Sequence, residues 1–140
     1  MIILVDTNVF IGACLGNGAS CEVVERCIQG QFTPVVGTAL YLEYEAVMQR
    51  KAIFRKSRLD EVERGDLLDI FLSSCRWTPI YFGWRPNLPD EGDNHLIELA
   101  VAGSAQVIVT RNLNDLTGGD LSFPGISCQT PEIFLQEVAK

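Results

Sequence analysis

Short apolar runs alternate along the chain with longer segments of helical periodicity. The runs are rich in β-branched side chains and lack polar alternation, which is typical of strands buried on both faces of a parallel sheet. They predict strands at 2–5, 34–37, 77–82, 106–109 and 126–129. Apolar side chains at helical spacing predict helices at 9–29, 38–50, 59–75 and 96–103, and from 131 onwards. This alternation predicts a three-layer α/β/α sandwich with a mainly parallel sheet of about five strands.

Local signals refine three of the predicted helices. Gly16, Asn17 and Gly18 predict a turn within the first helical segment, with Ser20 capping the helix that follows. Thr130 and Pro131 are the expected N-cap and first residue of the last helix. The helix at 59–75 is expected to turn a stripe of apolar side chains to the core: Val62, Leu67, Leu68, Phe71 and Leu72.

Composition adds limits on size and location. The 140 residues are enough for one domain, 1–140, with a core of its own. No apolar run approaches the ~20 residues of a membrane span, and the N-terminus lacks the order of a signal peptide, so we expect a cytoplasmic protein without a membrane segment. The five cysteines form no Cys-x-x-Cys pair and are expected to be free thiols. A net charge of −7 argues against broad adhesion to nucleic acid but allows a local basic patch.

Two acidic residues are candidates for a functional site. Asp6 follows the first strand directly, and ligands of open α/β sheets bind at the carboxyl ends of the strands. The alternative is that Asp6 or Asn8 simply caps the next helix. Glu43 lies on the apolar stripe of its helix, where a carboxylate requires a partner or a metal ion. Glu45 is the competing candidate, and the apolar periodicity of the helix favours Glu43 over Glu45 by only a small margin.

The second half of the chain holds a further acidic cluster. Asp93 shares a helix face with core residues, although a capping-box spacing from Asp90 offers a structural explanation for both. His95, the only histidine, is expected to lie off the core stripe without a catalytic role. The apolar strand at 106–109 delivers a run of polar residues from Thr110 to Asp115 to the same edge of the sheet.

Positive charge is concentrated in one segment. Five of the eleven basic residues lie between positions 50 and 58: Arg50, Lys51, Arg55, Lys56 and Arg58. Such a run usually forms a solvated surface, and its functional alternative is contact with phosphate groups. We hypothesise that Arg50, Lys51, Arg55 and Lys56 line the approach of an RNA backbone or of an acidic protein segment.

Four motifs together resemble the PIN-domain ribonucleases. They are the strand ending in Asp-Thr-Asn, the helical Glu43, Asp-x-x-Asp-Asn-His-Leu-Ile-Glu-Leu-Ala, and Val-Ile-Val-Thr-Arg-Asn-Leu-Asn-Asp-Leu, and they span Ile2 to Leu116. The resemblance implies a pocket of acidic residues that binds Mg²⁺ or Mn²⁺ and hydrolyses single-stranded RNA. Asp6, Glu43 and Asp93 match the recurrent acidic positions of the family. At the fourth, many members have Asp where this chain has Asn112, and Asp115 follows three places on.

The chemistry of divalent cations agrees with this resemblance. Mg²⁺ binds oxygen ligands and usually keeps several waters. We expect Asp6 and Asp93 to be direct ligands, and Glu43 and Asp115 to act through water or to orient the attacking water. Hydrogen bonds to these carboxylates are expected from four neighbours: Thr7, Asn8, Thr110 and Asn112.

The resemblance also suggests a biological setting. Small stand-alone PIN proteins are similar to the toxins of toxin-antitoxin pairs, in which an antitoxin segment covers the cleft, and such toxins often form homodimers. The alternative reading is a PIN-like module that binds RNA or a protein partner without cutting. Asn112 and the acidic net charge support that alternative.

Overall fold

The computed structural model describes residues 1–79, 94–112 and 125–140. Its strands are β1 (Ile2–Val5), β2 (Thr33–Val36), β3 (Arg76–Trp77), β4 (Val107–Val109) and β5 (Ser127–Gln129). Its helices are α1 (Thr7–Cys14), α2 (Gly18–Ile28), α3 (Thr38–Met48), the 3-10 helix η1 (Lys51–Phe54), α4 (Glu61–Ser74), α5 (Asn94–Ala102) and α7 (Pro131–Val138). Within the described residues no helix is both long and apolar enough to cross a membrane.

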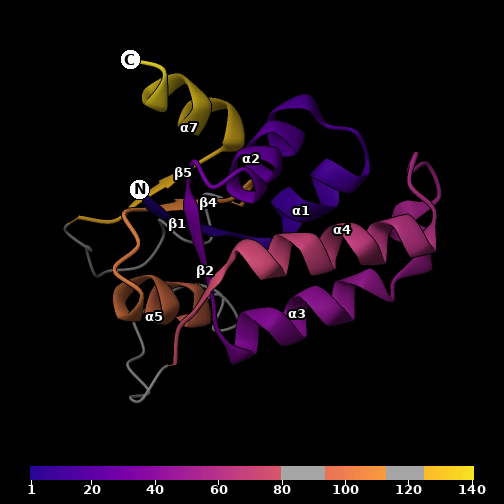
Figure 1. The fold of residues 1–140 in the computed structure, drawn as a ribbon, viewed down its shortest axis with the longest axis horizontal. Coiled ribbons are helices and arrows are strands. Elements are labelled where there is room, and N and C mark those ends of the chain that lie inside the picture. Colours follow the sequence, from indigo (N-terminus) through magenta and orange to yellow (C-terminus); the bar gives the residue numbers. More distant parts are fainter. Residues whose placement is uncertain (80–93, 113–124) are drawn as a thin grey trace.

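The five strands form one parallel sheet in the order β3-β2-β1-β4-β5. This confirms the predicted α/β class. The chain steps outward from β1 to β2 and β3 and then returns to the other side of β1 for β4 and β5. The strand order therefore reverses at β1, the position where ligands of open α/β sheets bind. The sheet carries helices on both faces, with α2 and α7 on one side and α5 on the other (Figure 1).

The core forms where these layers meet. β1 and β4 are buried on both faces, as continuous apolar strands of a covered parallel sheet should be. Beside them an aromatic cluster joins three helices: the Phe10 ring lies 5.6 Å from both Tyr44 and Phe71 between ring centroids. The cluster fixes α3 and α4 against α1, and thereby sets the position of every side chain that α3 presents to the edge of the sheet.

Several sequence predictions need correction. The turn at Gly16 is present, with a positive φ of 88°, but Asn17 caps α2 and Ser20 lies buried inside the helix. In α4, Leu68 and Phe71 are buried as predicted, whereas Val62 is 72% exposed because the first turn of this helix extends beyond the core. The predicted strand at 77–82 begins earlier, at Arg76, and already ends at Trp77, while positions 80–82 lie outside the described residues.

Candidate functional site

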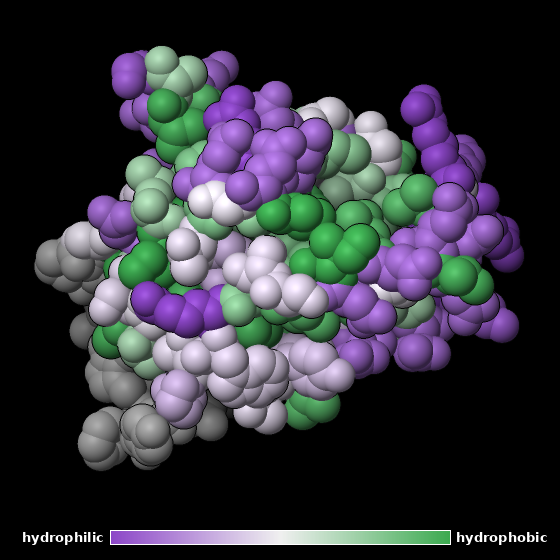
Figure 2. Space-filling model, viewed as in Figure 1, coloured by the Kyte–Doolittle hydropathy of each residue, from purple (hydrophilic) through white to green (hydrophobic). Residues whose placement is uncertain are grey.

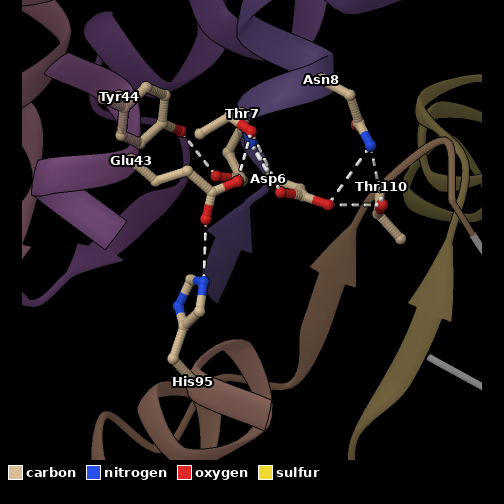
Figure 3. A network of polar contacts seen from close by, with 8 residues as sticks. Asp6, Thr7, Asn8, Glu43, Tyr44, His95 and Thr110 are labelled. Atoms are coloured by element: carbon tan, nitrogen blue, oxygen red, sulfur yellow. Dashed lines mark hydrogen bonds and ion pairs between the residues drawn. The ribbon is translucent and has the colours of Figure 1, made fainter. Parts of the chain in front are cut away.

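The candidate site lies at the carboxyl ends of the two central strands. Asp6 follows β1 and Thr110 follows β4, and the backbone N–H of Asp6 donates to the carbonyl of Val109 at 3.0 Å. Residues more than a hundred positions apart in the sequence thus meet at the topological switch point of the sheet. Figure 3 shows how their side chains converge there with residues from α1, α3 and α5.

Asp6 is buried and held from both sides. Oδ1 accepts the backbone N–H of Thr7 at 2.8 Å, which caps α1. Oδ2 accepts the hydroxyl of Thr110 at 2.8 Å and the amide of Asn8 at 3.3 Å. Asp6 therefore caps α1, as one sequence alternative predicted, and it also belongs to the polar cluster. Burial raises the pKa of this carboxyl, the charge of Glu43 adds to the rise, and the hydrogen bonds from Thr110 and Thr7 oppose it.

Glu43 reaches the same cluster from α3. Its Oε1 accepts the Thr7 hydroxyl at 2.8 Å, so one threonine stands between the two carboxylates. Its Oε2 lies 2.8 Å from Nε2 of His95. The hydrogen bond from His95 is the main cause that lowers the pKa of Glu43, against the opposing effect of burial. Glu45, the competing residue in the sequence, instead pairs with the hydroxyl of Tyr41 and lines the groove between α3 and α4.

Tyr44 locks this part of α3 onto the central strand. Its buried hydroxyl donates to the carbonyl of Val5 at 2.6 Å (Figure 3). Val5 and Asp6 are neighbours on one side of this bond, and Glu43 and Tyr44 are neighbours on the other. The bond therefore fixes the distance between the two acidic residues. Sequence reasoning missed Tyr44, although a tyrosine on a core stripe signals a hydrogen-bond partner.

His95 lies in a position that differs from the one predicted from the sequence. It was expected to lie away from the core without a partner, but its side chain is only 21% exposed and contacts Glu43. The reason is that α5 begins at Asn94, before the predicted start, so His95 lies in a formed first turn facing α3. Its Nδ1 is buried and has no hydrogen-bond partner among the described residues.

Arg111 joins the site to the C-terminal helix. Its backbone N–H donates to Oδ1 of Asn8 at 3.1 Å, and its guanidinium makes two bonds to Glu132, at 3.0 and 3.3 Å. The same guanidinium contacts Asn17 and Ser20 at the start of α2. Arg111 was not a candidate in the sequence, because its partners come from three separate segments.

The structure brings five of the predicted residues together: Asp6, Thr7, Asn8, Glu43 and Thr110. Asn112 lies two positions after Thr110, and its backbone N–H donates to the Thr110 hydroxyl at 3.0 Å. Asp93 and Asp115 lie outside the described residues. The basic residues at 50–58 lie apart from this cluster, on the connection between α3 and α4.

The donor set suits a hard divalent cation. Within residues 1–79, 94–112 and 125–140, no three His, Cys, Asp or Glu side chains are grouped closely enough to hold a metal ion. Asp6 and Glu43, however, supply carboxylate oxygens, the ligands that Mg²⁺ and Mn²⁺ prefer. Burial raises the pKa of Asp6, and repulsion from Glu43 adds to the rise. A cation beside them would relieve that repulsion.

Comparison with known proteins agrees with the fold and the motifs. The sequence matches the family profile described as PIN domain over residues 2–114. The structure is similar to the crystal structure of VapBC2 from Rickettsia felis bound to a DNA fragment from their promoter, with a TM-score of 0.59 and 17% identity. That similarity covers 93% of this chain and 98% of the other. At this identity it shows a common fold alone. The comparison with curated proteins gave no match.

Proposed function

Because the chain belongs to the PIN-domain family, we propose that it is a Mg²⁺- or Mn²⁺-dependent endoribonuclease that cleaves single-stranded RNA. The observation that carries the proposal is the pair of carboxylates Asp6 and Glu43, held by Thr7 at the switch point of the sheet. A buried acid whose pKa is raised by burial and by a second acid makes little structural sense unless a cation binds beside it.

The contacts of each side chain suggest its role at the site. Asp6, with its oxygens fixed by Thr7 and Thr110, is a direct ligand, and Asp93 is the second. Glu43, which Thr7 and His95 hold beside Asp6, orients the attacking water. Asp115 shares that task. The bound cation would lower the pKa of a water molecule and offset negative charge at the phosphate.

The proposed setting is a toxin-antitoxin pair. The structural relative is a VapBC2 complex, and we propose that this chain likewise binds an antitoxin protein and forms a homodimer. Asn112, where many family members have Asp, favours one alternative: a PIN module that binds RNA or a partner without cutting.

Cleavage assays test the proposal. Purified protein is incubated with a mixed pool of single-stranded RNA and Mn²⁺, with EDTA in a parallel reaction. We expect fragments in Mn²⁺ only, and their loss in Asp6→Asn. Absence of cleavage by the wild-type protein, with RNA binding retained, would favour the non-cutting module.

A further inference from the structure

Positive charge gathers on the connection between α3 and α4. Five of the chain's eleven basic residues form this set, which we call the basic lobe: Arg50, Lys51, Arg55, Lys56 and Arg58. The whole chain carries a net charge of −7, so its remaining part is more acidic still. The lobe lies at the far end of the α3–α4 pair, where Figure 2 shows a strongly hydrophilic surface.

The lobe's charges are not neutralised within the described chain. All five side chains are exposed. The ion pairs among the described residues involve Arg26, Arg111, Lys140 and His95, and none involves a lobe residue. An unpaired group of cations creates a local positive potential, which attracts polyanions even on a protein that is acidic overall.

The backbone that carries these charges is anchored to the core. Phe54, in the middle of the lobe, is only 5% exposed, and the guanidinium of Arg64 lies 4.4 Å from the centre of its ring. The hydroxyl of Ser57 donates to the carbonyl of Cys14 at 2.9 Å. Because the segment is already held, a ligand need not order its backbone on binding.

The lobe lies within reach of the candidate site. Glu43 and Arg50 belong to α3 and the residues just after it, and at ~1.5 Å per helical residue their separation along the axis is about 10 Å. The charge of Arg50 contributes to the lowered pKa of Glu43. A polyanion that enters the acidic pocket can therefore extend onto the lobe.

We propose that the basic lobe binds the phosphate backbone of single-stranded RNA and holds the strand several nucleotides from the acidic pocket. The choice of RNA as the polyanion rests on the proposed ribonuclease function. An acidic protein segment would be the competing ligand, but it has no reason to approach a pocket of carboxylates, whereas a metal-bound substrate has one.

The test measures RNA affinity against salt, without metal and in the Asp6→Asn background, so that no cleavage contributes. The lobe variant is Arg55→Gln/Lys56→Gln. The control is Arg26→Gln/Lys140→Gln, which removes the same charge from positions outside the lobe. Anisotropy of a labelled single-stranded RNA of about 15 nucleotides gives the slope of log K against log salt, to which each phosphate contact adds roughly 0.7.

We expect the lobe variant to flatten the slope by about 1.4 relative to the Asp6→Asn parent, and the control to leave it unchanged. Equal slopes in all three proteins would overturn the proposal, because the lobe cations would then make no phosphate contact. Salt-independent RNA binding by the parent would do the same, because it would exclude phosphate contacts by the lobe. A flattened slope stands even if the cleavage assay is negative, so the two proposals fail separately.

Discussion

At the scale of single residues, Asp6 and Glu43 share a pocket but have pKa values displaced in opposite directions. Burial and the neighbouring charge of Glu43 raise the pKa of Asp6, while the hydrogen bond from His95 lowers that of Glu43. Because the folded-state pKa of Asp6 is raised, the protein loses stability as the pH rises from the unfolded-state pKa through the folded-state pKa. Because the folded-state pKa of Glu43 is lowered, this residue adds stability at a pH above its unfolded-state pKa. That stability is lost as the pH falls through the folded-state pKa.

Asp6→Asn should therefore raise the melting temperature of the metal-free protein at pH 7. Each kcal/mol of relieved cost corresponds to roughly 2–4 °C. The gain should disappear as the pH falls below ~4, because the folded-state carboxyl, whose pKa is raised, is protonated first and the unfolded-state carboxyl follows near its ordinary pKa. Glu43→Gln should lower the melting temperature at pH 7, by less, since its side chain is 37% exposed and screened by solvent. Thermal scans in EDTA check both. Shifts of the same sign would contradict the assignment.

His95 should behave as a positioning residue for Glu43. His95→Leu removes the donor to Oε2, and loss of such a supporting contact typically costs about 10–100-fold in activity or metal affinity. His95→Gln keeps an N–H donor and should recover part of the loss. The readouts are the rate of RNA cleavage and Mn²⁺ affinity by calorimetry. If Leu and Gln are equally impaired, the contact with Glu43 is not what matters.

The sequence identified site residues that stand out within their own segment, but not those whose roles depend on partners far away in the sequence. Asp6 and Glu43 could be proposed because each stands out within its own segment, one after a buried strand and one on an apolar helical face. His95 and Tyr44 could not be assigned, because their roles depend on contacts with Glu43 and Val5, each tens of positions away. The places of Asp93 and Asp115 remain predictions.

At the scale of elements, α3 is the component that sets the site. Its N-cap, Gly37, offers no side-chain hydrogen bond, so the helix is held chiefly by packing and by Tyr44. The start and type of most elements followed from apolar periodicity. Most boundaries shifted by a residue or two, but the strand predicted at 77–82 ends at Trp77. The cap of α2 moved from Ser20 to Asn17, because both residues are good caps and only the backbone decides between them.

Tyr44→Phe should isolate the bond from α3 to β1. It deletes one buried hydroxyl and keeps the edge-to-face contact of the ring with Phe10, so we expect a loss of about 0.5–1.5 kcal/mol in the free energy of unfolding. Urea denaturation provides the measurement. Tyr41→Phe is the matched control, because that hydroxyl pairs with Glu45 at the surface. Equal stability of the two variants would mean that the Val5 contact does not hold the helix.

At the scale of the whole molecule, the sheet brings strand ends from distant parts of the chain to one edge. The parallel arrangement was predictable because a helical segment lies between each pair of successive predicted strands from 2–5 to 106–109. The strand order β3-β2-β1-β4-β5 was not, since it depends on which side of β1 the chain returns to. That return is what puts Thr110 against Asp6 and makes the site.

A bound cation should stabilise the whole fold. A ligand specific for the native state contributes about 2.7 kcal/mol at a hundredfold excess over its dissociation constant, or roughly 5–10 °C in melting temperature. Mn²⁺ should produce this rise in the wild-type protein. Asp93→Asn should blunt the rise and increase the metal-free melting temperature if Asp93 is a ligand. An unaltered response to Mn²⁺ would make Asp93 a helix cap instead.

The central claim is that the carboxylates at the switch point of the sheet perform metal-dependent RNA cleavage. Its most direct test is the initial rate of RNA cleavage in Mn²⁺ for the wild type, Glu43→Gln and Glu45→Gln, because the two glutamates are two positions apart and lie on different faces of α3. We expect a loss of about 100-fold for Glu43→Gln, the upper end of what removal of a group that supports a metal site typically costs, and a rate near wild type for Glu45→Gln. Equal rates for the two variants would contradict the claim.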